Sequence, residues 1–175
     1  MSNQCNPDAA LAGRRSVLLG GAAAMGAGIS GVLGLPAASR AAGAFEVTRT
    51  DAEWRGRLTP ERFRVLRGHG TERAGSSPLD KEARRGTYHC AGCDLSLYRS
   101  DTKFDSRTGW PSFWAPIEGA VGTAADRGWF GTRTEVHCRR CGGHLGHVFE
   151  DGPKPTGLRY CMNGVALAFV PAAAA

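Results

Sequence analysis

The chain has 175 residues and a formal net charge of +6. This length allows one modest domain and no more. Its basic residues occur in scattered pairs, such as Arg84-Arg85 and Arg139-Arg140, and its aromatic residues do not interleave with a basic stripe, so nucleic acid is not expected as a partner.

Residues 1–44 have the three parts of a secretory signal. Arg14 and Arg15 precede an uncharged run over 17–35, and small residues follow. The arginine pair suggests export by the twin-arginine route, and six glycines make the run a poor membrane anchor. An anchor and a chance Arg-Arg pair are the alternatives. We expect a signal peptide over 1–44 and a periplasmic domain over 45–175, which an anchor would also place outside the inner membrane.

Two short helices are predicted at the start of the domain. Thr50 and Glu53 form a capping box ahead of an apolar pair one turn apart. Thr59-Pro60 is a typical start for the second helix, because proline fits the first helical position, and a glycine shortly afterwards ends it. A loop is predicted over 71–80, which contains glycine and proline.

From Gly86 onward the sequence predicts short strands and turns. The predicted strands cover residues 87–90, 95–98, 129–132, 134–138, 145–149, 158–162 and 165–170. The segment 104–114 packs four aromatic residues into a loop with glycine and proline, and it could either plug the core or form an apolar wall around a methyl group. The expected fold is a small, mostly antiparallel β domain with N-terminal helices.

Four of the six cysteines form two Cys-x-x-Cys knuckles, Cys90 with Cys93 and Cys138 with Cys141. The two-residue spacing lets both sulfurs of a knuckle turn to one point, and two facing knuckles supply the four thiolates of a structural zinc site. In an oxidising compartment the same residues could instead form two disulfides. A protein exported in the folded state could bind its metal before export, so we favour zinc.

Cys161 is the fifth cysteine of the domain, and an odd number in an exported protein indicates a thiol with its own purpose. In a strand, Arg159 and Asn163 would share one face with it. A cation and an amide beside a thiol favour the thiolate, which is the nucleophile. His144 and His147 follow the second knuckle and could deliver a proton, or they could be structural.

The chain from about Asp51 to Phe169 resembles the B-type peptide methionine sulfoxide reductases. The resemblance rests on motifs that occur in order along nearly the whole domain: Asp51-Ala52-Glu53-Trp54, Leu58-Thr59-Pro60-Glu61, Gly86-Thr87-Tyr88, the two cysteine knuckles, Phe104-Asp105-Ser106, Gly109-Trp110-Pro111-Ser112-Phe113, Arg133-Thr134-Glu135-Val136, His144-Leu145-Gly146-His147-Val148-Phe149, and Arg159-Tyr160-Cys161 with Asn163. It implies a mainly β fold of two small antiparallel sheets with N-terminal helices, bound together by zinc through the two knuckles.

The resemblance also implies an activity, the thiol-dependent reduction of methionine-R-sulfoxide in oxidised proteins back to methionine. Cys161 would attack the sulfoxide sulfur and be left as sulfenic acid. The histidines would orient water and help to protonate the oxygen, and Trp110 would receive the methyl group. The implied site residues are Cys161, His147, His144 and Asn163 for catalysis, Trp110 and Arg159 for substrate binding, and Cys90, Cys93, Cys138 and Cys141 for zinc.

Two positions depart from the family pattern. Relatives often carry a resolving cysteine where this chain has Thr108, and Arg107 replaces the usual glycine. With no spare thiol in the domain, the expected reductant is a thioredoxin-like protein or a small thiol. We expect a monomer that meets the membrane only during export. The competing interpretations are a non-catalytic zinc module, which would not need Cys161 beside two histidines, and a thiol–disulfide oxidoreductase, which would bind no metal.

Overall fold

The computed structural model describes residues 45–128 and 131–173, which belong to one compact unit. The expected signal peptide over 1–44 lies outside the described residues. In the part that is described, no helix has the length and apolar character needed to cross a membrane.

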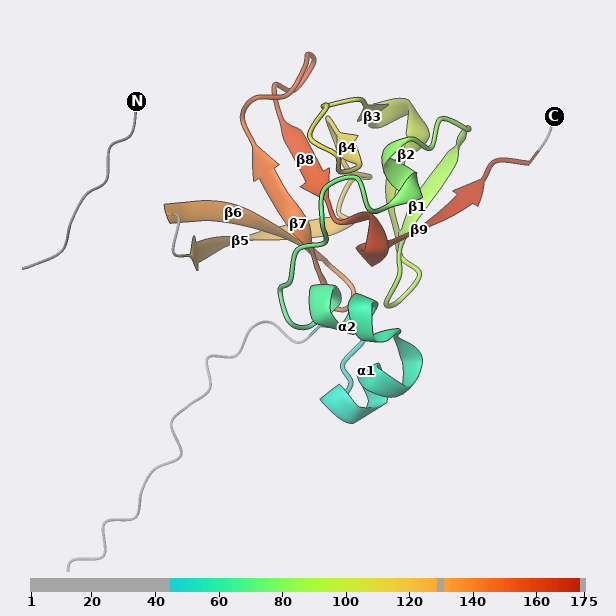
Figure 1. Ribbon diagram of the computed structural model, residues 1–175, viewed down its shortest axis with the longest axis vertical. Helices are drawn as coiled ribbons and strands as arrows, with labels where there is room; N and C mark the ends of the chain where they lie inside the picture. Colours follow the sequence, from blue (N-terminus) through green and yellow to red (C-terminus); the bar gives the residue numbers. More distant parts are fainter. Residues whose placement is uncertain (1–44, 129–130, 174–175) are drawn as a thin grey trace, which may run out of the picture. The chain divides into compact units, whose positions relative to one another are not determined.

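Two short helices, α1 (Asp51–Arg57) and α2 (Pro60–Leu66), lie together at one end of the unit (cyan in Figure 1). Both begin where the sequence predicts. The Thr50 side chain accepts a hydrogen bond from the amide of Glu53, whose carboxylate accepts one from the amide of Thr50 at 2.7 Å. This capping box satisfies amides that a helix start otherwise leaves unpaired.

Nine strands of the described chain form two antiparallel sheets (Figure 1), which confirms the predicted fold class. The smaller sheet has the order β2 (Ser96–Arg99), β1 (Gly86–Cys90), β9 (Leu167–Pro171). The larger sheet has the order β3 (Lys103–Phe104), β4 (Ser112–Phe113), β8 (Arg159–Met162), β7 (His144–Phe149), β6 (Gly131–Cys138), β5 (Val121–Gly128). Three 3-10 turns connect them: η1 (Pro78–Asp80), η2 (Ser100–Thr102) and η3 (Gly164–Ala166).

The predicted strands differ from the observed ones in several places, and the short strand β4 and the end of β3 lie within the segment that was predicted as a loop. The sequence does not predict β5, because its side chains over 123–125 are exposed and carry no alternating apolar pattern. The two strands predicted over 129–132 and 134–138 correspond to the single strand β6 from Gly131 onward, and positions 129 and 130 lie outside the described residues. The last strand begins two residues later than predicted, because η3 takes up the chain before Leu167.

The core joins the two sheets through aromatic side chains. Tyr98 of β2 stacks on Phe113 of β4 with ring centroids 4.3 Å apart, and Tyr88 of β1 meets the same ring edge-on at 4.9 Å. All three rings are fully buried. Such pairs add about 0.5–1.5 kcal/mol beyond the burial of their area, so they help to hold β4, and through it β8, against the smaller sheet.

Candidate active site and metal centre

The four knuckle cysteines meet where the two sheets join. Cys90 ends β1 of the smaller sheet, and Cys138 ends β6 of the larger one. In each knuckle the carbonyl of the first cysteine accepts a hydrogen bond from the amide four residues later, Asp94 at 2.8 Å and Gly142 at 2.9 Å. Both of these residues have a positive φ, of 62° and 66°. The two knuckles therefore close with the same backbone turn.

The sulfur positions fit a metal and do not fit two disulfides. The closest pairs run between the knuckles, Cys90 to Cys141 at 3.7 Å and Cys93 to Cys138 at 3.5 Å, and all four sulfurs lie within 4.8 Å of one another. Sulfurs at about 2.3 Å from a tetrahedral zinc are about 3.8 Å apart. A disulfide would bring two of them to about 2.05 Å. The four cysteines can hold one metal ion in a closed site.

Two arginine side chains donate hydrogen bonds to backbone carbonyls of this cluster. Arg67 donates to the carbonyl of Cys141 at 3.0 Å, and Arg140 donates to the carbonyl of Cys93 at 3.4 Å. Four thiolates around a divalent ion carry a net charge of about −2. Neighbouring guanidinium groups offset part of this buried negative charge.

Cys161 lies in a separate small pocket of about 120 Å³, lined by Thr71, Trp110, Arg133, Gly146, His147, Phe149, Cys161 and Asn163. It sits on β8, opposite His147 on β7 and opposite Ser112 on β4. The volume corresponds to about four water molecules, enough for the end of one small side chain. The pocket thus combines a thiol, a histidine and two aromatic rings.

The environment of Cys161 differs from the sequence expectation. Burial raises the pKa of its thiol, and this effect outweighs a hydrogen bond from Thr108 and the charge of Arg159, which both lower it. Arg159 forms a two-point ion pair with Asp151, both distances being 2.8 Å, and its guanidinium lies 4.4 Å above the Phe149 ring. The flanking Arg159 favours the thiolate, as the spacing predicts, but burial has the larger effect and sets the net direction, and sequence spacing does not reveal burial.

His147 is hydrogen-bonded to Asp126 of β5, with Nε2 2.7 Å from the carboxylate. Asp126 also binds Arg133 at 2.8 Å. The hydrogen bond from His147 lowers the pKa of Asp126, so the carboxylate is ionised and can only accept. Burial lowers the pKa of His147. The ring is therefore neutral at neutral pH, with its proton on Nε2 and Nδ1 left as the acceptor.

His144 does not line the pocket. It is 2% exposed, its ring centroid lies 5.3 Å from that of His147, and its Nδ1 is 2.7 Å from Glu135. The same carboxylate oxygen binds the exposed His69 at 3.0 Å. The hydrogen bond from His144 lowers the pKa of Glu135, so the ionised carboxylate keeps the proton of His144 on Nδ1. His144 therefore packs against His147 on the side away from the pocket and helps to fix the position of that ring.

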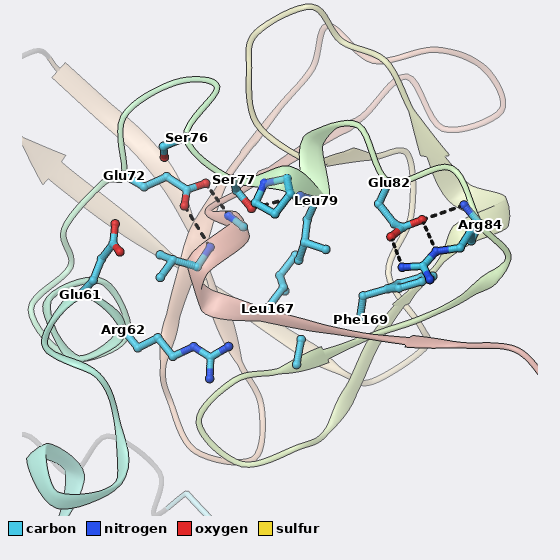
Figure 2. A pocket seen from close by; sticks show the side chains of 14 residues that line it. Glu61, Arg62, Glu72, Ser76, Ser77, Leu79, Glu82, Arg84, Leu167 and Phe169 are labelled. Atoms are coloured by element: carbon cyan, nitrogen blue, oxygen red, sulfur yellow. Dashed lines mark hydrogen bonds and ion pairs between the residues drawn. The ribbon is translucent and has the colours of Figure 1, made fainter.

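Glu72 ties together three parts of the pocket wall and is only 3% exposed. Its carboxylate accepts hydrogen bonds from the amides of Gly164 at 2.6 Å and Val165 at 3.0 Å (dashed lines in Figure 2). Its own amide donates to the side chain of Asn163 at 2.9 Å, and its carbonyl accepts from the Trp110 indole at 3.3 Å. Asn163 is consequently held by backbone groups, and its orientation depends on Glu72.

The aromatic segment over 104–114 has both of the predicted roles, since one ring lines the pocket and another is buried in the core. Trp110 lines the pocket, whereas Phe113 is fully buried in the core. A second aromatic wall comes from Phe149 at the end of β7, far away in the sequence. The segment is therefore both a core plug and an apolar wall.

A wider groove of about 720 Å³, which Glu72 helps to line, lies next to β9 (Figure 2). The described residues that line it include no cysteine or histidine. Its charged groups include the ion pair of Glu82 with Arg84 at 2.6 Å. The thiol chemistry that the sequence predicts belongs to the smaller pocket around Cys161.

The sequence analysis did not assign a role to several groups around the Cys161 pocket: Glu72, Asp126, Glu135, Arg133 and Phe149. Arg133, Glu135 and Phe149 entered the sequence analysis only as parts of family motifs. Asp126 stands 21 positions from the histidine that it binds, and Glu72 stands 91 positions from Asn163. No local pattern in the sequence marks such pairs.

The comparisons with known proteins agree with these motifs. The model of the SelR domain matches residues 58–171. A peptide methionine sulfoxide reductase MsrB from Agrobacterium fabrum is 52% identical over 127 residues, which cover 72% of this chain and 94% of that protein. The enzymes of the same name from Leptospira interrogans and Methanosarcina mazei are 51% and 50% identical, over 71% of this chain and 96% and 89% of their own lengths.

A solved structure, the Mis18 'Yippee-like' domain, is similar with a TM-score of 0.43 and 17% identity, covering 52% of this chain and all of that one. This likeness is too low to carry an argument. The family match and the curated relatives carry the assignment on their own. The chain belongs to the B-type peptide methionine sulfoxide reductases, as its motifs predicted, and the prediction of this enzyme activity is confirmed.

Proposed function

We propose that the enzyme reduces the R epimer of methionine sulfoxide in proteins, with Cys161 as the nucleophile. The observation that carries this proposal is the pocket itself, in which the thiol faces His147 and the rings of Trp110 and Phe149. The non-catalytic zinc module is not favoured, because it gives no reason for this thiol pocket away from the metal cluster.

In the first step the sulfur of Cys161 attacks the sulfoxide sulfur. The oxygen passes from the substrate to Cys161, the thiol proton ends on that oxygen, and the products are methionine and a sulfenic acid. The substrate sulfur gains two electrons and Cys161 loses two, so no other reductant is needed in this step. A thiol that burial keeps protonated brings the required proton with it.

His147 is suited to move that proton. Its neutral ring offers Nδ1 as an acceptor for the proton of Cys161, and the Asp126 carboxylate stabilises the imidazolium that then forms. His144, bound to Glu135, acts as a positioning residue for His147. A sulfoxide becomes a good electrophile only as its oxygen is protonated, so the rate depends on this transfer.

The two aromatic rings would orient the substrate. The methyl group of methionine sulfoxide would lie against Trp110, whose indole is fixed by the carbonyl of Glu72. The oxygen would then point toward the polar side of the pocket, where Asn163 and His147 lie. The guanidinium of Arg159 packs on the Phe149 ring and so supports this aromatic side of the pocket. The opposite epimer would exchange the methyl group and the oxygen and so lose both sets of contacts.

Recycling would use an external thiol. Thr108 stands where many relatives have a resolving cysteine, and the other four cysteines of the described chain are in the metal cluster. An incoming thiol attacks the sulfenic acid, forms a mixed disulfide and releases water, and a second thiol restores Cys161. A thioredoxin-like protein or a small thiol can do this.

We propose zinc as the metal of the four-cysteine cluster, held by Cys90, Cys93, Cys138 and Cys141. A closed set of four thiolates leaves no coordination position for substrate, so the ion would supply folding stability and no chemistry of the reaction. Glu135 precedes the second knuckle, and His144 and His147 follow it. The bound ion would therefore also hold these three side chains in place.

The first prediction tests the reaction. We expect the domain over 45–175 to consume the R epimer of a methionine sulfoxide peptide at least about 100-fold faster than the S epimer, because a lost set of pocket contacts costs roughly 3 kcal/mol or more. With substrate but no reductant, one thiol should disappear and Cys161 should gain one oxygen by mass spectrometry. Equal rates for the two epimers, or an oxygen on another residue, would contradict the proposal.

The second prediction concerns location. We propose that residues 1–44 are a twin-arginine signal peptide and that the domain over 45–175 is periplasmic, on the arrangement of Arg14, Arg15 and the apolar run. Changing both arginines to lysine should leave precursor in the cytoplasm, as fractionation and immunoblotting would detect. The control changes Arg84 and Arg85 to lysine and should be exported normally. Normal export of the Arg14/Arg15 variant would instead support the general secretory route.

A further inference from the structure

A chain of three hydroxyl groups ends at the sulfur of Cys161. Ser112 of β4 lies opposite Cys161, and its hydroxyl is 2.7 Å from that of Ser106. The Ser106 hydroxyl is 2.8 Å from that of Thr108, which is 3.9 Å from the Cys161 sulfur. Ser112 is fully buried and the other two side chains are partly buried, so these groups have little access to water.

The hydrogen bonds of this chain can run in either direction, because each hydroxyl has one proton to donate and can also accept. At the far end, Ser112 donates to the carbonyl of Trp110 at 3.1 Å. In one direction Ser106 donates to Ser112 and Thr108 donates to Ser106, so Thr108 can accept the thiol proton of Cys161 in the resting enzyme, before that proton moves to His147. When Cys161 loses that proton, the whole chain can reverse, so that Thr108 donates to the sulfur.

We infer that Thr108 is a further catalytic residue, whose hydroxyl, held by Ser106 and Ser112, stabilises the ionised sulfur of Cys161 as the nucleophile forms. This inference rests on the proposed role of Cys161. Hydrogen bonds that end on a charged atom are roughly twice as strong as neutral ones, and a chain of them is polarised along its length. The position that supplies a resolving thiol in many relatives thus supplies a hydrogen-bond donor here.

The other charged groups around Cys161 do not replace the hydrogen bond from Thr108. The charged and titratable groups around Cys161 are Arg159 on its own strand, His147 on β7 and Arg133 on β6. Arg159 is paired with Asp151, and Arg133 is paired with Asp126, so both positive charges are partly offset, although Arg159 still lowers the pKa of Cys161 through its charge and a hydrogen bond. The hydroxyl of Thr108 is the largest of the contributions that lower the pKa of Cys161.

The third prediction tests this role without using catalysis. Thr108→Val keeps the shape of the side chain and removes the donor, so alkylation of Cys161 by iodoacetamide at pH 7 should become about tenfold slower, with the pH profile displaced to higher pH. Thr108→Ser keeps the hydroxyl and should react within about twofold of the wild type. Ser106→Ala, which breaks the chain one step away, should slow alkylation by a smaller factor.

The matched control is Thr102→Val, which removes a hydroxyl bound to the carbonyl of Arg99 in a nearby turn and should leave alkylation unchanged. The inference is overturned if Thr108→Val reacts like the wild type at every pH, or if Thr108→Ser slows as much as Thr108→Val, because the contact would then be packing alone. If Thr108→Val does not fold, Ser106→Ala and Thr108→Ser decide between the same outcomes. Failure of the proposed function has a different signature, a Cys161→Ser variant that still reduces sulfoxide.

Discussion

Replacing Cys138 with serine is expected to lower the midpoint of thermal unfolding by more than about 10 °C. Cys138 belongs to β6 and its sulfur lies 3.5 Å from that of Cys93, whose knuckle follows β1, so the proposed zinc ties the two sheets together. Loss of a structural metal costs about 4 kcal/mol or more, and each kcal/mol lowers the midpoint by roughly 3–5 °C in a domain of about 130 residues. Calorimetry and elemental analysis for zinc on the same sample would measure both effects.

A matched control comes from Cys161→Ser, which removes a thiol outside the cluster. It should retain one zinc per chain and unfold within about 3 °C of the wild type. If the four cysteines formed two disulfides instead, a reducing agent would lower the midpoint of thermal unfolding and a metal chelator would leave it unchanged. Folded, active protein without zinc would contradict the proposal of a structural metal.

The fold could be predicted where local rules decide the structure. The Thr50–Glu53 capping box and the Thr59-Pro60 helix start are local, and both helices begin there. The strands with alternating or continuous apolar residues were also found, since burial on a sheet face requires that pattern. β5 was missed because its edge position leaves most of its side chains in water.

The cysteine cluster was predictable for a similar reason. The two-residue spacing within each knuckle is a local constraint, and the structure brings all four sulfurs within 4.8 Å of one another. In the first knuckle the residue with positive φ is not a glycine. Asp94 takes the positive φ in that knuckle, at the position that Gly142 occupies in the second. A four-residue turn fixes the conformation there, and the glycine itself is not required.

The Cys161 pocket shows where sequence reasoning ends. The spacing of Arg159, Cys161 and Asn163 suggested three side chains acting together on one strand face. In the structure Asn163 follows the end of β8 and accepts a hydrogen bond from the amide of Glu72, while Arg159 forms an ion pair with Asp151. Burial then determines the direction of the pKa of Cys161. These effects arise from packing between distant segments, which one sequence does not contain.

Replacing Cys161 with serine is expected to reduce kcat for methionine-R-sulfoxide by at least about 1000-fold. Serine has nearly the same shape but is a much weaker nucleophile toward sulfur and cannot form a sulfenic acid, so the first step has no substitute within the pocket. Because Trp110, Phe149 and His147 remain in place, binding of the sulfoxide should change by less than about threefold. Turnover with a small dithiol and equilibrium binding of a sulfoxide peptide would measure the two quantities separately.

Measuring substrate binding and kcat separately distinguishes a nucleophilic role of Cys161 from a packing role. If the cysteine were only a packing element, serine would disturb binding and turnover together, whereas a nucleophile affects turnover alone. The matched control is Cys5→Ser in the full-length chain, which removes a thiol far away in the sequence and should retain full activity. Activity that survives in the Cys161 variant, with zinc bound, would point to another reducing group and would overturn the proposed chemistry. Loss of activity accompanied by loss of binding would instead assign Cys161 to the pocket wall.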